Sequence, residues 1–267
     1  MTEKHKKQVA IIGLGYVGTA YKKLFPNAVI YDPPKGFSDK DLVNECELAI
    51  VSVPTPMGDN GDCDISIVEE VLEWINTPLI LIKSTVQPGT TEKLRQKTGK
   101  RICHSPEYVG EGGYYVPFWK YPHPTEPQHH SFMIIGGEPR DCDDILDFFQ
   151  PVLGADKTYY QCSSTESEII KYMENCAIGA KVILCNEFAK ICDTFGASYN
   201  KVREGFILDE RLGRMFTSVF VDKRGFGGKC LPKDINGIVS ASTKAGYEPK
   251  FLKEILSTNE RLKTNQT

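Results

Sequence analysis

A short glycine motif near the amino terminus restricts the fold more than any other feature of this sequence. The motif GLGYVG occupies residues 13–18, directly after the apolar run Val9–Ile12 and before a stretch with helical spacing. Glycines after a strand allow a tight turn, and the helix that starts there points its free N–H groups at a bound phosphate. This context predicts a dinucleotide-binding unit. Its expected cofactor contacts are Gly13, Gly15 and Gly18.

An acidic residue follows the motif at the spacing that dinucleotide-binding units use. Asp32 stands nineteen residues after Gly13, where its carboxylate can accept hydrogen bonds from a ribose and repel a 2′-phosphate. The expected cofactor is therefore NAD rather than NADP. Lys35 can contact the same ribose, although a solvated lysine explains it equally well. Two later apolar runs are followed by Thr55 and Thr85, whose hydroxyls can reach a nicotinamide ribose or simply form turns. A glycine-rich turn in another α/β protein is the alternative for the whole set.

Short apolar runs alternate with helical stretches through the first half of the chain. Runs that are apolar on both faces and separated by helices are typical of a parallel sheet covered on both sides. From Ser164 the pattern becomes helical, with one helix to about Phe195 and others at 200–206, 234–244 and 248–263. We therefore expect a Rossmann-like, doubly wound α/β domain over residues 1–163 and an all-helical domain over residues 164–267. The expected strands are Val9–Ile12, Ala28–Tyr31, Leu48–Val53, Leu79–Ile82, Ile102–His104 and Phe132–Ile135.

Composition excludes several classes of function. The 267 residues include 32 Lys and Arg against 35 Asp and Glu, a net charge of −3, which indicates no nucleic-acid partner. The apolar runs are too short to cross a membrane, and no apolar segment follows the basic amino terminus as in a signal peptide. Nine scattered cysteines without a CxxC pair predict neither a disulfide framework nor a metal site. They are typical of a reducing, cytoplasmic location.

The decapeptide Gly225–Asp234 concentrates reactive groups. Its glycines let the backbone approach a bulky ligand, and Cys230 stands between Lys229 and Lys233. Positive charge and a following helix N-terminus both favour the thiolate, which is the nucleophilic form of cysteine. The alternative is a turn that carries an unreactive buried cysteine. The crowding of glycines, lysines and Asp234 favours a catalytic Cys230.

Other polar residues share a helix face or follow a predicted strand. Lys171 and Asn175 are four residues apart on the long helix, so both can donate hydrogen bonds to one substrate oxygen. Glu107 and Glu111 follow the fifth predicted strand, where a carboxylate can act as a base or bind a sugar. A solvated helix face and surface acids are the alternatives.

Taken together, these motifs resemble the UDP-glucose/GDP-mannose dehydrogenase family over essentially the whole chain. The resemblance implies NAD-dependent oxidation of the primary alcohol of a nucleotide sugar to a carboxylate, with two NAD⁺ per sugar. It also implies that Cys230 holds the aldehyde as a thiohemiacetal, which becomes a thioester that water cleaves. The matching segments, in the family's order, are GLGYVG, SVPTP, KSTVQPGTT, SPEYVGEGG, the Lys171/Asn175 helix, DERLG and GFGGKCLPKD.

The resemblance also assigns further roles to individual residues. Lys171 and Asn175 correspond to an oxyanion-stabilising pair, and Glu107 corresponds to the base for thioester hydrolysis. Thr85 and Asp234 surround the attacking water. The long helix near residues 165–195 corresponds to the family's dimerisation element, so a homodimer is expected. The cofactor positions carried over are Tyr16, Val17, Asp32, Lys35, Thr55, Thr85, Glu111 and Lys233. The substrate positions are Glu107, Glu111, Lys171, Asn175, Arg211 (toward the neighbouring subunit), Phe216 and Gly227.

The sequence departs from the family pattern in ways that leave the substrate undecided. Family members continue into a third α/β domain that closes over the nucleotide, whereas this sequence ends at Thr267, and Asp222-Lys223-Arg224 replaces the usual Pro-Gly. UDP-glucose is the expected substrate, with GDP-mannose or an N-acetylhexosamine nucleotide as alternatives. A two-electron β-hydroxyacid dehydrogenase shares the Lys-x-x-x-Asn pair without needing Cys230. A third hypothesis is a non-catalytic NAD-binding remnant that requires a partner chain.

Overall fold

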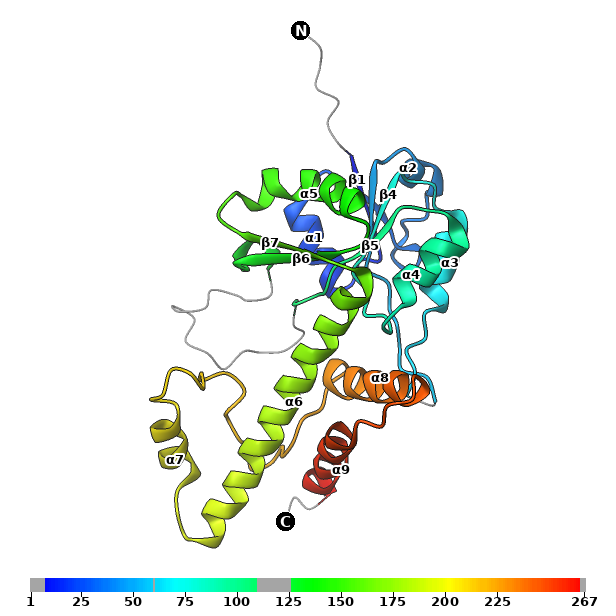
Figure 1. Cartoon of the computed structure of the whole chain (residues 1–267). Coiled ribbons are helices and arrows are strands. Elements are labelled where there is room, and N and C mark those ends of the chain that lie inside the picture. Colours follow the sequence, from blue (N-terminus) through cyan, green and yellow to red (C-terminus); the bar gives the residue numbers. More distant parts are fainter. Residues whose placement is uncertain (1–7, 60, 110–125, 265–267) are drawn as a thin grey trace. The chain divides into compact units, whose positions relative to one another are not determined.

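The computed structural model describes residues 8–59, 61–109 and 126–264 (Figure 1). The chain forms two compact units, and the division between them falls inside helix α6, between Lys171 and Tyr172. Among the described residues, unit 1 holds 8–58, 63–109 and 126–171, and unit 2 holds 59, 61–62 and 172–264. The domain boundary at residue 163 stays a prediction. No helix in these ranges is long and apolar enough to cross a membrane.

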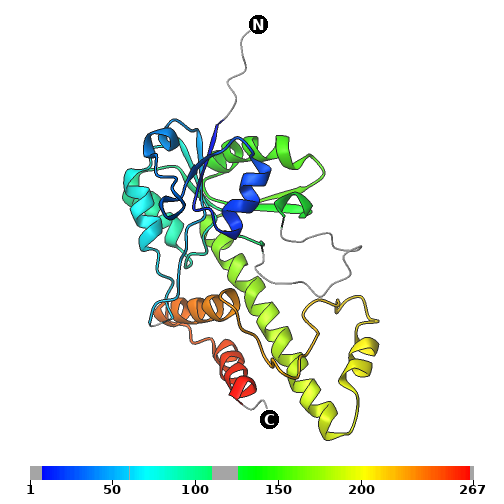
Figure 2. The same ribbon diagram turned by 180° about the vertical axis from the view of Figure 1, so that it is seen from behind.

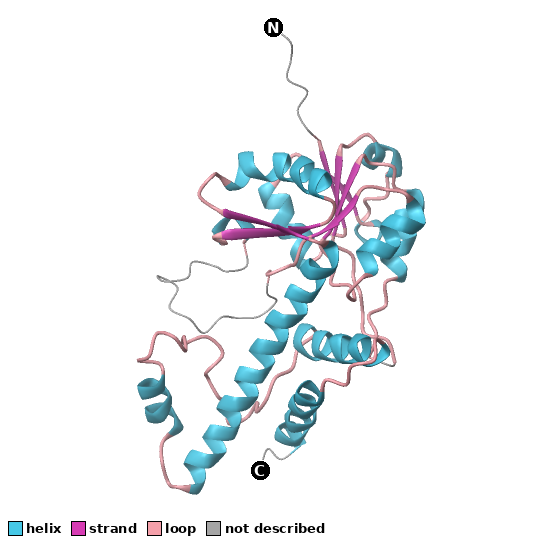
Figure 3. Cartoon of the chain, in the orientation of Figure 1, coloured by secondary structure: helices cyan, strands magenta, loops and turns pink. Residues whose placement is uncertain are grey.

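Unit 1 is built on a seven-stranded sheet with the order β2-β1-β3-β4-β5-β6-β7. The strands of this sheet are drawn in magenta in Figure 3. Ile12 of β1 is in register with Tyr31 of β2 and with Val51 of β3, so the carboxyl ends of these parallel strands share one edge. The helices and strands are β1 (Val9–Ile12), α1 (Tyr16–Leu24), β2 (Val29–Tyr31), η1 (Pro33–Lys35), α2 (Lys40–Asn44), β3 (Leu48–Val51), α3 (Ser66–Trp74), β4 (Leu79–Ile82), α4 (Thr90–Thr98), β5 (Ile102–His104), η2 (Pro127–His129), β6 (Phe132–Gly136), α5 (Pro139–Leu153), β7 (Thr158–Cys162) and the start of α6 (Ser164–Thr194).

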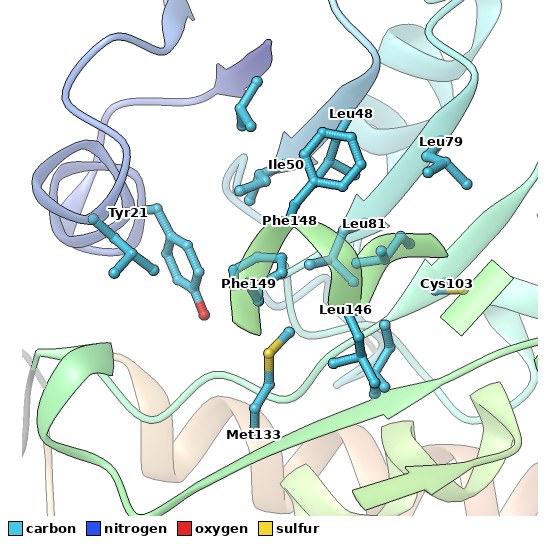
Figure 4. Packing of buried hydrophobic residues seen from close by; sticks show 14 of the residues in the cluster. Tyr21, Leu48, Ile50, Leu79, Leu81, Cys103, Met133, Leu146, Phe148 and Phe149 are labelled. Atoms are coloured by element: carbon cyan, nitrogen blue, oxygen red, sulfur yellow. The ribbon is translucent and has the colours of Figure 1, made fainter. Parts of the chain in front are cut away.

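The two faces of the sheet bury alternate side chains of the same strands, because neighbouring residues of a strand point in opposite directions. On one face Ile11, Ile50 and Leu81 pack against α1 and α5, which lie on the same side of the sheet when it is seen from behind (Figure 2). Figure 4 shows Tyr21 of α1 and Phe149 of α5 in this cluster. On the other face Ala10, Ile12, Ala49, Val51, Ile80 and Ile82 pack against α2, α3 and α4. The doubly wound α/β fold expected from the sequence is confirmed.

Two features of the sheet differ from the expectation. β7 is missing from the predicted strands, and β5 pairs with β6 in the antiparallel direction, at His104 and Gly136. β7 lies at the edge of the sheet, and its sequence TYYQC is only partly buried. An edge strand that buries few side chains needs no continuous apolar run, so the pattern used to find the other strands is absent from it.

Unit 2 is helical in its described residues. After α6, which has 31 residues, come α7 (Tyr199–Phe206), α8 (Cys230–Lys244) and α9 (Lys250–Thr264). α8 begins four residues before the expected start at residue 234, because a proline is tolerated in the first turn, where its missing N–H has no partner to lose. The buried apolar cluster of this unit consists of Cys176, Ile183, Phe226, Ile235, Ile255 and Leu262.

Candidate active site

The glycine motif forms a tight turn at the carboxyl end of β1. Gly13 has a left-handed φ of +87°, and a Cβ there would lie 2.7 Å from the carbonyl oxygen of Ser52 on the neighbouring β3 loop. A Cβ on Gly18 would lie 1.9 Å from the carbonyl oxygen of Gly13, whereas Gly15 faces open space. Only glycine fits at positions 13 and 18, which lets the glycine turn pack closely on the first turn of α1.

The first turn of α1 leaves room and hydrogen-bond donors for an anion. No side chain caps this helix, and its first turn contains no acidic residue. The free N–H groups of a helix start bind phosphate well under these conditions. Tyr16, the first residue of α1, is 63% exposed, whereas Val17 packs against the core. These features fit the pyrophosphate of a dinucleotide.

Asp32 and Lys35 both contact the glycine turn. The Asp32 carboxylate accepts a hydrogen bond from the Leu14 N–H through Oδ2, at 2.7 Å, and the Lys35 ammonium donates to the Leu14 carbonyl. Oδ1 of Asp32 is left to accept from the hydroxyls of an adenosine ribose. The carboxylate, the turn and the uncapped helix together fit NAD.

The loops after β3 and β4 are tied to each other. Thr55 donates its hydroxyl hydrogen to the Thr85 carbonyl at 2.8 Å, and Ser84 donates to the Val53 carbonyl at 2.7 Å. Cys63 also approaches the Thr85 carbonyl, with a sulfur–oxygen distance of 3.1 Å. The structure thus brings together two residues that the sequence analysis selected separately. It also places Cys63 at this contact, which no local spacing pattern in the sequence predicts.

A buried lysine holds the segment after β5. Lys83 donates to the Ser105 hydroxyl at 3.0 Å and to the Pro106 carbonyl at 2.7 Å, and its Nζ lies 3.3 Å from Oε2 of Glu107. Burial lowers the pKa of Lys83, while the nearby Glu107 carboxylate raises it. Burial, and then Glu107, raise the pKa of the Tyr21 hydroxyl. The sequence analysis did not select Lys83, although a lysine directly after an apolar strand was a usable signal.

Glu107 is buried and held from two sides. Its Oε1 accepts hydrogen bonds from the N–H groups of Tyr108 and Val109, both at 2.7 Å, while Oε2 faces Lys83. A cavity of about 20 Å³ lies beside it and is lined in part by Phe132. That volume is enough for one water molecule. Glu111, the second predicted carboxylate, lies outside the described residues.

The first turns of α6 carry Lys171 to the same region of unit 1. The Lys171 ammonium lies 5.3 Å from the centre of the Tyr108 ring, a cation–π distance, and Tyr108 directly follows Glu107. One turn earlier, the Ser167 hydroxyl lies 2.8 Å from Nδ1 of His104. Burial, and then the charge of Lys83, lower the pKa of His104 to about 3, so this imidazole is neutral at ordinary pH.

Asn175 and Asp234 form a buried pair inside unit 2. The Asn175 amide donates to Oδ2 of Asp234 at 2.5 Å, and Nζ of Lys233 lies 2.6 Å from Oδ1. Asp234 is 2% exposed, so its carboxylate is buried between the Asn175 amide and the Lys233 ammonium. Fifty-nine residues separate Asn175 from Asp234, and their contact links α6 to the first turns of α8.

Cys230 is the first residue of α8, and its side chain is exposed. The preceding loop turns through Gly225 and Gly228, which both have a φ of +76°. Asn259 of α9 holds this loop by accepting from the Phe226 N–H at 2.7 Å and donating to the Phe226 carbonyl at 3.0 Å. The loop therefore presents a thiol at a helix N-terminus, where the dipole favours a thiolate.

Two asparagines that support this loop were missed by the sequence analysis. Asn259 contacts Phe226, and Asn186 of α6 accepts from the Gly225 N–H at 3.2 Å. Both side chains are buried. Asn259 stands between Ile255 and Leu262 on the apolar face of α9, and a polar residue within an apolar face was the available signal.

The remaining predicted substrate residues lie in the segment between α7 and α8. Arg211 pairs with Asp209, two residues earlier, and its side chain is 88% exposed. Phe216 has a left-handed φ of 61°, which is unusual for a bulky residue. Gly227 faces open space. These positions are accessible to a ligand or a second subunit, and their assignment to the substrate stays a prediction.

Two sequence models of one family match the chain. The NAD-binding domain of the UDP-glucose/GDP-mannose dehydrogenase family matches residues 36–124, and the central domain of the same family matches residues 165–261. The UDP-glucose 6-dehydrogenase AglM of Haloferax volcanii is 26% identical over 95% of this chain and 69% of that protein. The UDP-glucose 6-dehydrogenase TuaD of Bacillus subtilis is 27% identical over 96% of this chain, which spans 63% of its length.

Solved structures support the same fold. A UDP-glucose dehydrogenase from Pyrobaculum islandicum superimposes with a TM-score of 0.77 at 23% identity, covering 98% of this chain and 69% of that one. A UDP-D-ManNAc dehydrogenase from Pyrococcus horikoshii gives a TM-score of 0.74 at 23% identity, covering 96% and 68%. The chain belongs to the UDP-glucose/GDP-mannose dehydrogenase family and contains that family's NAD-binding and central domains.

Proposed function

We propose that this chain oxidises the primary alcohol of a nucleotide sugar to a carboxylate with two molecules of NAD⁺. The observation that carries the proposal is in unit 2, where the exposed Cys230 and the buried Asn175–Asp234 pair occupy the first turns of α8 and the facing side of α6. UDP-glucose is the proposed substrate, since the curated relatives described above are UDP-glucose 6-dehydrogenases. GDP-mannose and N-acetylhexosamine nucleotides are the alternatives within this class.

The glycine turn and Asp32 are the proposed holders of NAD. The first turn of α1 would bind the pyrophosphate, and Asp32 with Lys35 would bind the adenosine ribose. Thr55 and Thr85, on loops that are tied together, would lie at the nicotinamide end. When bound, NAD⁺ accepts one hydride in each of the two oxidations.

Cys230 is the proposed nucleophile. Its thiolate attacks the carbon of the first product, an aldehyde, so that a carbon–sulfur bond forms and the carbonyl oxygen takes a proton. The resulting thiohemiacetal loses a hydride and a proton in the second oxidation and becomes a thioester. Water then adds to the thioester carbon, the carbon–sulfur bond breaks, and the thiolate leaves the carboxylate product. Covalent capture keeps a reactive aldehyde from escaping between the two oxidations.

The neighbouring polar groups have proposed supporting roles. Lys171 and Asn175 would donate hydrogen bonds to the oxyanion that forms on the substrate. The bond from Asn175 to Asp234 fixes the orientation of this amide. Glu107 would accept a proton from the attacking water. The resemblance to the family also assigns Asp234 and Thr85 to that attacking water.

A homodimer through α6 and a cytoplasmic location complete the proposal. The second half of α6 exposes Leu184, Phe188 and Ile191 in addition to the apolar side chains that it buries. A second copy of the chain is the proposed cover for this surface. None of the nine cysteines forms a disulfide, which fits a reducing compartment.

Measurement of NADH formed per UDP-glucose consumed tests the proposed reaction, with wild-type protein and the Cys230→Ser variant. We expect two NADH per sugar from the wild type, and a loss of acid formation of at least about 10³-fold in the variant, since serine is a much poorer nucleophile here. Cys162→Ser, a partly buried cysteine of β7, is the matched control and should keep full activity.

The other outcomes discriminate among the alternatives. One NADH per substrate, unaffected by Cys230→Ser, would support a two-electron β-hydroxyacid dehydrogenase. NAD binding without turnover of any nucleotide sugar would indicate a remnant that needs a partner chain. Full acid production by Cys230→Ser would exclude the thioester route.

A further inference from the structure

A buried carboxylate on α6 has no part in the reaction proposed above. Glu168 is fully buried, one helical turn before Lys171. Its Oε2 accepts a hydrogen bond from the Gly89 N–H at 2.5 Å, and its Oε1 accepts from the Thr91 N–H at 2.7 Å. Seventy-seven residues separate Glu168 from Thr91, so these bonds join two distant segments of unit 1.

Glu168 supplies the cap that helix α4 lacks. α4 begins at Thr90 after Gly89, which has a left-handed φ of +85° and no side chain to accept from the first N–H groups. The Thr91 N–H is buried and the Gly89 N–H is partly buried. Such donors need an acceptor, because a buried donor without a partner costs about 1–3 kcal/mol. The Glu168 carboxylate therefore accepts hydrogen bonds from N–H groups at the start of α4, which is the usual role of an N-cap side chain.

The same turn of α6 is also fixed to the sheet. The Ser167 hydroxyl donates to the His104 carbonyl at 3.1 Å and lies 2.8 Å from Nδ1 of the same residue, at the end of β5. A Cβ on Gly136 of β6 would lie 2.4 Å from the Ser167 Cβ, so α6 packs closely on that strand. Ser167 and Glu168 thus attach one helical turn to β5, β6 and α4, and Lys171 follows directly.

We propose that Glu168 is a positioning residue whose ionised carboxylate holds two proposed active-site segments of unit 1 in one arrangement. The first segment is the part of the β4–α4 loop that runs from Thr85 to Gly89. The second is the turn of α6 that carries Lys171. The inference rests on the proposed function only in assigning Thr85 and Lys171 to the reaction.

The charge state of Glu168 makes this arrangement sensitive to pH. Burial raises the pKa of Glu168 to about 7, against the lowering effect of its hydrogen bonds to Thr91 and Gly89. Protonation turns one carboxylate oxygen into a hydroxyl donor, which faces an N–H donor and loses that hydrogen bond. The elements around it also carry titratable or charged groups. These are Glu166 and Lys171 in the first turns of α6, Lys83 after β4, Cys103 and the neutral His104 on β5, and Glu92, Lys93, Arg95 and Lys97 on α4.

Amide hydrogen exchange at Gly89 and Thr91, together with pH–rate profiles, tests the proposal in Glu168→Gln, Glu168→Asp and the wild type. The Gln variant has the shape of the carboxylate but places an NH₂ group against one of the two amides. We expect its exchange at these amides to be at least about 10-fold faster at alkaline pH, and its kcat to fall about 10- to 100-fold with a much smaller change in KM. The Asp variant, which keeps the charge, should recover part of both properties.

The pH profile separates positioning from a general loss of structure. The wild-type rate should fall on the acid side with a midpoint of about 7, and this step should be absent from Glu168→Gln and displaced in Glu168→Asp. Glu166→Gln is the matched control, because Glu166 also accepts from a backbone N–H but is exposed on the same helix. It should keep the wild-type profile.

Two results would overturn the inference. The first is wild-type protection of the Gly89 and Thr91 amides in Glu168→Gln. The second is a wild-type pH profile in that variant. If the wild type oxidises no nucleotide sugar, the proposed function fails, and the exchange data still decide whether Glu168 holds the loop. If Glu168→Gln does not fold, the same amides and profile are compared between Glu168→Asp and the wild type.

Discussion

The two units of the chain bury their side chains to different extents. In unit 1 both faces of the sheet are covered by helices, and even charged groups such as Lys83, Glu107 and Glu168 are buried with partners. In unit 2 the apolar cluster has six buried members among the described residues, while large apolar side chains remain exposed. The exposed ones include Met173, Leu184, Phe188, Ile191, Phe195, Leu208, Val221 and Phe251.

Among the described residues, unit 2 thus leaves more of its large apolar side chains exposed than unit 1 does. Large apolar side chains that gather on one exposed face mark interaction sites, and the proposed homodimer would cover those of the second half of α6. A partner of unit 2 would bury its exposed apolar side chains, as the helices of unit 1 bury the apolar side chains of the sheet. The four predictions below test this contrast, beginning with the largest expected effect.

Substitution of Lys83 by Met should destabilise unit 1 by about 3–5 kcal/mol, because it leaves the buried Glu107 carboxylate without its cation. It also removes the donor to Ser105 and Pro106. Urea unfolding followed by the fluorescence of Trp74, which lies in unit 1, measures the change. Lys97→Met is the control, since Lys97 pairs with Glu69 at the surface, and such pairs contribute about 0–1 kcal/mol. Equal losses in the two variants would contradict the buried role of Lys83.

Truncation of one buried isoleucine in each unit compares the two cores. Ile50→Ala in unit 1 and Ile235→Ala in unit 2 should each cost about 2–5 kcal/mol, since both side chains are fully buried and leave a cavity. Hydrogen exchange should locate the loss of Ile235→Ala in α8 and α9 and leave the sheet protected. Ile169→Ala, at a side chain that is 44% exposed, should cost less than about 1 kcal/mol. Loosening of the sheet by Ile235→Ala would argue against independent cores.

The raised pKa of Glu168 should make the free energy of unfolding depend on pH. Its pKa in the folded chain, about 7, lies above the ordinary value of 4.5, so the folded state keeps a proton that the unfolded state has lost. The free energy of unfolding should therefore fall as pH rises from about 4.5 to 7, by up to about 3 kcal/mol, and then level off. Thermal or urea unfolding of wild type and Glu168→Gln across this range measures the difference. A wild-type curve parallel to that of the Gln variant would contradict the raised pKa.

A charge on the exposed face of α6 should weaken self-association. Phe188→Asp should raise the dimer dissociation constant by about 30-fold or more, equal to about 2 kcal/mol, while the stability of unit 1 stays unchanged. Analytical ultracentrifugation measures the association. Tyr160→Asp, at a similarly exposed aromatic of β7 in unit 1, is the control and should leave association unchanged. A monomeric wild type would refute the proposed homodimer.

Local patterns in the sequence were sufficient for most of the fold. β1 to β6 were predicted because buried parallel strands require continuous apolar runs, and the long helix was predicted from its repeating apolar positions. β7 was not predicted, because an exposed edge strand does not require a continuous apolar run. The start of α8 was placed too late because Pro232 reads as a helix breaker, whereas in a first turn it is not.

Some residues of the candidate site were also predicted from local sequence, whereas others were found only in the structure. The sequence by itself determined the glycine turn, the acidic residue after β2 and the cysteine loop, because each depends on residues that are close along the chain. Only the tertiary structure decided that Lys83 faces Glu107, that Asn259 holds the cysteine loop and that Glu168 caps α4. These contacts join residues 24 to 77 positions apart, and no spacing rule connects them. Burial requires that every such polar group find a partner, but the fold alone determines which partner it finds.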